Sequence, residues 1–272
     1  MSLLDAFLKA PSAGSLFSLA VSQRGGRIDT GIAYGDHPRH KLDIYSPADG
    51  KTVQAIVIFI YGGGWDSGQR QMYGFVGSSL AARGYLAIVP DYRLFPEVRY
   101  PEFMADISAA YQWVVTEKAA NSEVPIIMMG HSAGAHMAAL LTYDTRYIDS
   151  CDTSLVRPHG FIGMSGPYGF DAKAHERTKD IFSTAHSEHE VKPVARVTQG
   201  APHALLFHGR KDTTVLTLNA IRLREALQAA GSDAEVVEIE QAGHLGPLFA
   251  LSRPYERKFN ILPIIDRFIA AT

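Results

Sequence analysis

The sequence predicts an α/β fold in which a mainly parallel sheet of eight strands is covered by helices on both faces and carries a small cap insertion. Short apolar runs alternate along the chain with longer amphipathic runs, an order typical of parallel strands joined by helices. The composition agrees, because 46% hydrophobic and 20% charged residues in a chain of 272 are typical of a globular protein with a sizeable core. We therefore expect a single domain over residues 1–272.

The expected strands are apolar runs, several of which end in polar or glycine-rich sequence. They cover residues 31–34, 41–45, 54–61, 85–90, 125–130, 160–165, 203–209 and 234–240. Periodicity predicts helices between them, at about 70–83, 102–118, 133–143, 214–230 and 255–270. Gly84 and Gly231 stand where helix C-caps are expected. Because reacting groups in open α/β sheets gather beyond the carboxyl ends of the strands, a site is expected there.

Two segments interrupt this alternation. Residues 166–202 form a segment too long for a plain loop in a compact domain, and we interpret it as a small helical cap or lid. Residues 1–25 begin with apolar positions at helical spacing, which predicts an N-terminal helix that contributes to the cap. A targeting segment is the alternative for this stretch, but Pro11 interrupts its apolar run and no clear cleavage site follows.

Charge and cysteine content exclude several classes of function. The formal net charge is −2, and the chain lacks the basic stripe that nucleic-acid binding requires. No apolar run is long enough for a membrane-spanning helix. Cys151 is the only cysteine, so the chain can form no internal disulfide and is compatible with a reducing compartment. We expect a cytoplasmic protein without nucleic-acid partners.

A candidate nucleophile lies where the fifth predicted strand meets a helix. Ser132 stands between Gly130 and Gly134, preceded by a strand-like run and followed by a helix-like run. This is the arrangement of a nucleophile elbow, a tight strand-to-helix turn in which larger residues would collide. Such a turn lifts the hydroxyl out of the backbone and places the Ala133 amide at a helix N-terminus, which favours negative charge. The alternative is a serine that merely ends a strand.

A serine hydroxyl needs a base, usually a histidine held by a carboxylate. His244 follows the last predicted strand in a glycine-containing loop, and it is our candidate base. His208 also ends a strand but is interpreted as ordering a loop. Asp212 lies between Ser132 and His244 in the chain, just after a strand, and is our candidate acid. Its alternative role is that of a helix N-cap.

A glycine loop follows the third predicted strand. The sequence Tyr61-Gly62-Gly63-Gly64-Trp65 leaves backbone amides exposed and lets the chain approach a substrate closely. Such amides can bind the oxyanion that forms when a serine attacks a carbonyl carbon. The alternative is a flexible turn, which would not explain its place after the third strand.

These motifs together resemble the α/β-hydrolase superfamily. YGGGW and PDYRLFPE (90–97) are similar to the HGGGW and DYRLAPE segments of hormone-sensitive-lipase-like esterases. The resemblance implies a serine carboxylesterase in which the amides of Gly63, Gly64 and Ala133 bind the oxyanion, while Asp91 and Arg93 are structural. The sequence departs from the family where Tyr61 replaces the histidine that braces the glycine loop.

The elbow sequence GHSAG is closer to small carboxylesterases of the aryl-formamidase-like group, because His131 stands where the lipases have an acidic residue. We therefore expect hydrolysis of short-to-medium acyl esters, with formyl amides and a non-catalytic ligand receptor as alternatives. No metal or organic cofactor is implied. Dimers formed through the last strand are common in the family, which leaves a homodimer open. The residues expected to line the substrate pocket include Trp65, Tyr168, Phe170 and Leu245.

Overall fold

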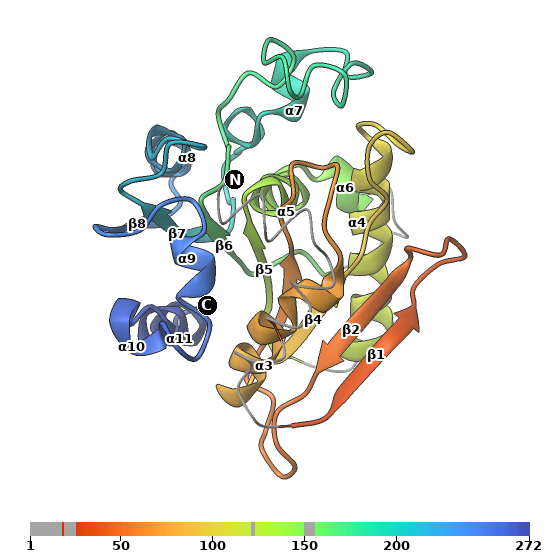
Figure 1. The fold of residues 1–272 in the computed structure, drawn as a ribbon, viewed down its shortest axis with the longest axis vertical. Coiled ribbons are helices and arrows are strands. Elements are labelled where there is room, and N and C mark those ends of the chain that lie inside the picture. The colour runs from red at the N-terminus through yellow and green to blue at the C-terminus, as the bar shows by residue number, and fades with distance from the viewer. Residues whose placement is uncertain (1–17, 19–25, 121–122, 150–155) are drawn as a thin grey trace.

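The computed structural model describes residue 18 and residues 26–120, 123–149 and 156–272. Within them an eight-stranded sheet has the order β1-β2-β4-β3-β5-β6-β7-β8 (Figure 1). The β1–β2 and β2–β4 pairs are antiparallel and all other pairs are parallel. The strands are β1 (Ile28–Ala33), β2 (Lys41–Tyr45), β3 (Ile56–Ile60), β4 (Leu86–Pro90), β5 (Ile126–His131), β6 (Gly160–Met164), β7 (His203–Gly209) and β8 (Ala234–Ile239). The predicted α/β fold class is confirmed.

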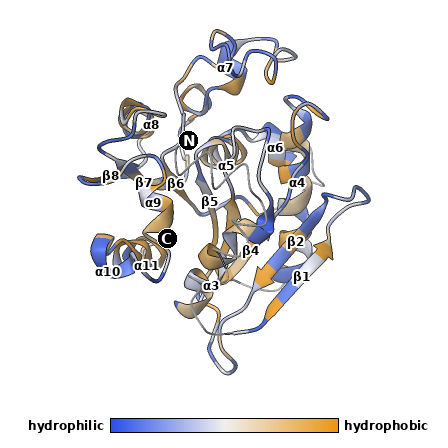
Figure 2. Ribbon diagram, in the orientation of Figure 1, coloured by the Kyte–Doolittle hydropathy of each residue, from blue (hydrophilic) through white to orange (hydrophobic). Residues whose placement is uncertain are grey.

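The central strands are buried along their whole length. Every residue of β3, β5 and β6 is buried, whereas exposed and partly buried residues occur throughout β1 and along β8. Strands covered by helices on both faces need continuous apolar sequence, which explains why IVIFI and IIMM read as unbroken runs. Figure 2 shows that outer elements such as β8 and α10 carry more hydrophilic residues. The carboxyl ends of these strands, where the sequence predicts a site, therefore belong to the most buried part of the sheet.

Two groups of helices flank the sheet (Figure 1). One contains α4, α5 and α6, which contact one another, and it continues to α8 through the short helix η3. The other contains α3 and α11, which the Arg83–Asp266 ion pair joins. The helices are η1 (Arg70–Tyr73), α3 (Gly74–Ala82), α4 (Glu102–Val114), η2 (Val115–Ala119), α5 (Ala133–Tyr143), α6 (Arg146–Asp149), α7 (Glu188–Val191), η3 (Pro193–Ala195), α8 (Leu218–Ala229), α9 (Gly246–Phe249), α10 (Glu256–Phe259) and α11 (Leu262–Ala270).

Two predicted helices have different limits in the structure. The helix expected over 214–230 begins at Leu218, because the preceding residues form a turn around the Asp212 carboxylate. The helix expected over 255–270 is divided into α10 and α11. Asn260 between them adopts the left-handed conformation, with φ of 48°, which an asparagine tolerates better than most residues and which ends a helix.

Residues 166–202 contain little regular structure. They form turns together with the short helices α7 and η3, at the top of the molecule in Figure 1. The segment is nevertheless packed onto the domain, since Phe182 is fully buried and meets Trp65 edge-on at 5.1 Å between ring centroids. The segment is thus less helical than the sequence indicated. The N-terminal helix expected over 1–25 falls, apart from residue 18, outside the described residues.

Candidate active site

The turn around Ser132 has the geometry of a nucleophile elbow. Strand β5 ends at His131 and helix α5 begins at Ala133, so Ser132 alone makes the reversal, with φ of 53° and ψ of −123°. Such a backbone conformation costs on the order of 1–3 kcal/mol for a residue with a side chain. A Cβ on Gly134 would lie 2.1 Å from the carbonyl oxygen of Ile60, and one on Gly130 would lie 2.5 Å from that of Gly134. Only glycine therefore fits at position 130, two residues before Ser132, and at position 134, two residues after it.

The structure brings the three predicted side chains Ser132, His244 and Asp212 together at the carboxyl edge of the sheet. His244 Nε2 lies 2.8 Å from Ser132 Oγ, and His244 Nδ1 lies 2.8 Å from Asp212 Oδ2. Because a carboxylate can only accept, Nδ1 carries the proton of a neutral imidazole, and Nε2 is left to accept the hydroxyl proton of Ser132. All three side chains needed for base-assisted attack are within hydrogen-bond distance of one another along the chain Ser132–His244–Asp212.

The Asp212 carboxylate is held in place by the turn that follows β7. Its Oδ1 accepts hydrogen bonds from the amides of Thr214 and Val215, both at 2.9 Å, which leaves Oδ2 for His244. Burial opposes ionisation, but hydrogen bonds from His208 and His244 outweigh it and hold the pKa of Asp212 well below its usual range. The aspartate therefore organises its own turn and also holds the histidine. It is not the N-cap of α8, a position that Thr217 occupies.

His208 supports the turn around Asp212 through a hydrogen bond to its backbone. It is fully buried, its Nε2 donates to the carbonyl oxygen of Val215 at 2.7 Å, and it lies 3.4 Å from Asp212 Oδ2. Within the described residues, no hydrogen bond joins His208 to Ser132. This is the loop-ordering position that the sequence indicated.

His131 holds the loop that carries His244. Its Nε2 donates to the carbonyl oxygen of His244 at 3.0 Å, and the two rings lie 5.0 Å apart. Burial, together with the neighbouring His244, lowers the pKa of His131 to about 3, so the ring is neutral at neutral pH. No role in the site was predicted for this residue, although its place directly before Ser132 ties it to the elbow.

The glycine loop after β3 lies against the elbow. A Cβ on Gly62 would lie 3.0 Å from the Cβ of Ser132. Gly63 and Gly64 have φ of 129° and 62°, and a Cβ on Gly63 would lie 2.1 Å from the carbonyl oxygen of Ser67. Within the described part of the chain, the amides of Gly63, Gly64 and Ala133 donate no hydrogen bond. Three donors are therefore available near the hydroxyl of Ser132.

Tyr61 anchors this loop where the resembling family has a histidine. Its hydroxyl donates to Asp91 Oδ1 at 2.7 Å and accepts from Arg39 Nη2 at 2.9 Å. The same Arg39 nitrogen donates to the carbonyl oxygen of Gly68 at 2.9 Å, near the end of the loop. The Tyr61 ring is also stacked between two other tyrosines, Tyr73 and Tyr92. The tyrosine thus braces the loop through a buried network of hydrogen bonds.

Asp91 and Arg93 have the structural positions that the resemblance implied. Asp91 is buried and accepts hydrogen bonds from the Tyr61 hydroxyl and from the amide of Arg70. Arg93 forms an ion pair with the buried Asp106 at 2.6 Å. Neither residue lines the cavity beside Ser132.

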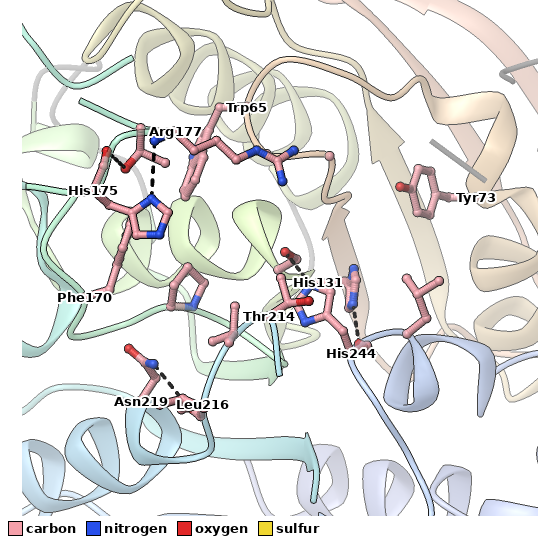
Figure 3. Close-up of a pocket in the computed structure, with 17 residues that line it drawn as sticks. Trp65, Tyr73, His131, Phe170, His175, Arg177, Thr214, Leu216, Asn219 and His244 are labelled. Carbon is pink, nitrogen blue, oxygen red and sulfur yellow. Dashed lines mark hydrogen bonds between the residues drawn. The ribbon is translucent and has the colours of Figure 1, made fainter. Parts of the chain in front are cut away.

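A cavity of about 330 Å³ opens beside Ser132 (Figure 3), within the usual range for a small-molecule site. Three of the four predicted pocket residues line it: Trp65, Phe170 and Leu245. Trp65 and Phe170 are stacked at 5.9 Å between ring centroids. The other lining residues are Gly63, Gly64, Tyr73, His131, Ser132, Pro167, His175, Arg177, Thr178, Thr214, Val215, Leu216, Asn219 and His244.

Tyr168 does not line this cavity, and its prediction as a pocket residue is wrong. Its side chain is buried and points into the core, where the hydroxyl lies 1.9 Å from the position of a Cβ on Gly163. Gly163 and Gly166 leave the space that the tyrosine fills. Nothing in the sequence distinguishes Tyr168 from Phe170, two positions further on.

A family model matches most of the chain that forms this fold and site. The model of the BD-FAE family matches residues 42–227, which include the glycine loop, Ser132 and Asp212. The chain belongs to the BD-FAE family. The predicted relationship to α/β hydrolases of the hormone-sensitive-lipase-like and small carboxylesterase group is confirmed.

Two relatives with esterase names agree with this assignment. Isoprenylcysteine alpha-carbonyl methylesterase ICME of Arabidopsis thaliana is 28% identical over 234 residues, covering 78% of this chain and 55% of that protein. Esterase LipC of Mycobacterium tuberculosis is 32% identical over 238 residues, covering 78% of this chain and 58% of that protein. This BD-FAE family chain thus spans little more than half the length of these relatives.

A solved structure shares the fold. The butyrate-bound esterase Est2 of Thermogutta terrifontis superposes with a TM-score of 0.72 at 24% identity, over 91% of this chain and 94% of that one. Among the described residues of the present chain, no helix is both long and apolar enough to cross a membrane.

Proposed function

We propose that this BD-FAE family chain is a serine carboxylesterase that hydrolyses short-to-medium acyl esters through an acyl-enzyme on Ser132. One observation carries the proposal: a continuous hydrogen-bonded chain from the Ser132 hydroxyl through His244 to Asp212, with both distances at 2.8 Å. This chain lies at the wall of a cavity that can hold a small ester. Its membership of a family with esterase relatives supports the same reaction class.

In the acylation step, Ser132 Oγ attacks the ester carbonyl carbon while His244 Nε2 takes the hydroxyl proton. The imidazolium that forms is stabilised by the ionised Asp212, whose low pKa keeps it negatively charged throughout the neutral range. The amides of Gly63, Gly64 and Ala133 donate to the oxyanion of the tetrahedral intermediate. When the intermediate collapses, His244 gives its proton to the leaving alcohol, and the acyl group remains on Ser132.

Deacylation repeats these steps with water as the nucleophile. His244 takes a proton from the water, the hydroxide adds to the acyl carbon, and the same amides hold the oxyanion. Collapse of this second intermediate releases the carboxylic acid and returns the proton to Ser132 Oγ. The segment 166–202, which supplies Phe170 and Thr178 to the cavity, acts as the cap over the nucleophile.

The size and lining of the cavity favour short-to-medium acyl chains. Its volume is about 330 Å³, and its walls are largely the apolar side chains of Trp65, Phe170, Val215, Leu216 and Leu245. Such walls stabilise an acyl chain by about 0.8 kcal/mol per buried methylene until the cavity is full. A long fatty acyl chain would extend out of this volume.

Hydrolysis of p-nitrophenyl acetate, butyrate and octanoate by the parent protein and by Ser132→Ala tests the proposal. We expect turnover with an initial burst of p-nitrophenol in the parent, and a loss of about 10⁴-fold or more in Ser132→Ala. An N-formyl aromatic amide measured alongside distinguishes the amide-hydrolase alternative, which predicts faster turnover of that substrate. Equal inactivity of both proteins on all four substrates would contradict the proposal, and ligand binding without turnover would favour a receptor.

A further inference from the structure

Arg177, an exposed residue, places a positive charge at the edge of the cavity beside the glycine loop. It belongs to the segment 166–202 and lines the cavity together with Ser132. Its Nη2 lies 3.1 Å from the position that a Cβ on Gly64 would occupy, so the guanidinium covers the loop that is proposed to bind the oxyanion. Figure 3 shows the side chain extending across the cavity from the cap side.

This guanidinium has no partner among the described residues, unlike those of several other arginines. Arg70, Arg93 and Arg146 each form an ion pair with an aspartate at 2.5–2.6 Å. Over the described residues, the Arg177 side chain forms neither an ion pair nor a hydrogen bond, and only its backbone amide donates, to His175 Nδ1. The carboxylate of Asp66 is 3.5 Å from the same Gly64 position but forms no ion pair with Arg177. The charge is therefore available to a ligand.

The rest of the cavity does not neutralise this charge. Its described lining contains no aspartate or glutamate and no lysine or arginine other than Arg177. His131 is kept neutral by burial. The remaining polar side chains are those of uncharged residues such as Thr178, Thr214 and Asn219, with His175 and His244. A single cationic side chain at the edge of a largely apolar cavity matches a ligand with one negative charge.

We propose that Arg177 binds a carboxylate carried by the ester substrate itself, close to the scissile bond. This inference rests on the proposed esterase function and narrows its substrate class to esters with an anionic group. A guanidinium binds a carboxylate through two parallel hydrogen bonds, a geometry that Lys or an amide cannot reproduce. A phosphate monoester dianion would need a second fixed cation, which the described lining does not offer.

The carboxylate can belong to the acyl part or to the alcohol part of the substrate, and two matched pairs of esters distinguish these. Mono-p-nitrophenyl succinate against its methyl ester tests the acyl side. The comparison of p-acetoxybenzoate with its methyl ester tests the alcohol side, because the carboxylate lies on the leaving phenol. For each pair, the preference is the ratio of kcat/KM for the anionic ester to that for the neutral one, measured in the parent protein and in Arg177→Gln.

We expect the parent protein to prefer the anionic member of one pair, and Arg177→Gln to lower that preference by about tenfold or more, as is typical for hydrogen bonds to a charged group. Raising the salt concentration should reduce the preference of the parent. Lys179→Gln is the matched control, since it removes a positive charge from the same segment. Lys179 does not line the cavity and is paired with Glu176 at 2.7 Å, so its substitution should leave the preference unchanged.

The inference is overturned if the parent shows no preference for the anionic ester in either pair, or if Arg177→Gln and Lys179→Gln lower the preference equally. Turnover of the neutral esters alone would then leave the esterase proposal standing. A measurement that needs no turnover separates the two proposals further: calorimetric binding of each anionic ester, and of its methyl ester, to Ser132→Ala. In one of the two pairs the affinity for the anionic ester should exceed that for the methyl ester and fall about tenfold when Arg177→Gln is added. Equal affinities within both pairs contradict the inference whether or not the parent is active.

Discussion

The two sides of the cavity are built in different ways. On one side, Ser132, Asp212 and His244 follow the strands β5, β7 and β8, and backbone hydrogen bonds of short turns fix each of them. On the other side, residues 167–178 lie outside regular secondary structure and are held by side-chain packing, such as Phe170 on Trp65, and by hydrogen bonds of side chains, such as that of Thr178 to the carbonyl oxygen of Ala172. The proposed reaction depends on fixed positions on the first side, and we infer that the second side sets the substrate preference.

The largest effect is expected from the acid of the triad. Asp212→Asn should lower kcat/KM for p-nitrophenyl butyrate by about 10³- to 10⁴-fold, because an amide neither fixes the tautomer of His244 nor stabilises its imidazolium. Asp171→Asn makes the same chemical change on the cap side, where Asp171 accepts a hydrogen bond from the amide of Ala174. Steady-state kinetics should show activity within about threefold of the parent for that control. Similar losses of kcat/KM in Asp212→Asn and Asp171→Asn would contradict the claim that the two sides of the cavity have different roles.

The next effect concerns stability. Gly134→Ala should lower the free energy of unfolding by about 3 kcal/mol or more, because its Cβ would meet the backbone carbonyl of Ile60 at 2.1 Å. Gly169→Ala is the matched change on the cap side, where the nearest atoms lie at 3.4 Å or beyond and are side-chain atoms. Urea unfolding should find that variant within about 1 kcal/mol of the parent. Equal destabilisation would show that the two sides are equally constrained.

A pH effect is expected where the two sides meet at His136. This buried side chain on α5 donates through Nε2 to the carbonyl oxygen of Val191 at 2.7 Å, and burial lowers its pKa to about 4. As the pH falls from about 6.5 to about 4, the unfolded chain takes up a proton at this residue and the folded chain does not. The free energy of unfolding should therefore fall by about 1.4 kcal/mol per pH unit over that range from this residue alone.

His136→Gln keeps a donor for Val191 but removes the titration, so it should flatten this acid slope. The remaining slope of the free energy of unfolding against pH includes the contribution of His131, whose pKa is also lowered by burial. His189→Gln replaces an exposed histidine of the cap and serves as the control, with the slope of the parent expected. The measurement is urea unfolding at several pH values. An unchanged slope in His136→Gln would contradict the expected linkage.

The smallest effect concerns chain length. Phe170→Ala should enlarge the cavity and raise the ratio of octanoate to acetate turnover by about fourfold, near the 0.8 kcal/mol gained for one more buried methylene. Tyr168→Phe changes a residue that lies in the core and not in the cavity, so the ratio should stay as in the parent. The p-nitrophenyl ester series measures both ratios. If Tyr168→Phe changed the ratio of octanoate to acetate turnover and Phe170→Ala did not, Tyr168 rather than Phe170 would line the cavity.

The sequence predicted the strand-end side well and the cap side poorly, for a physical reason. Ser132, Asp212 and His244 follow strands whose apolar runs are plain, and parallel strands bring their carboxyl ends to one edge. Tyr168 and Arg177 lie in a segment without periodicity, where orientation depends on distant contacts such as the space left by Gly163. The helix limits near Asp212 and Asn260 were missed because local hydrogen bonds and a left-handed residue override the amphipathic pattern.

The most direct test of the account is covalent labelling of the nucleophile. The parent protein is treated with diethyl p-nitrophenyl phosphate, digested, and analysed by mass spectrometry beside Ser132→Ala. An activated serine should displace p-nitrophenol and keep a single diethylphosphoryl group on Ser132, whereas the variant should carry none. A label on another residue, or equal labelling of both proteins, would contradict the claim that Ser132, His244 and Asp212 form a working triad.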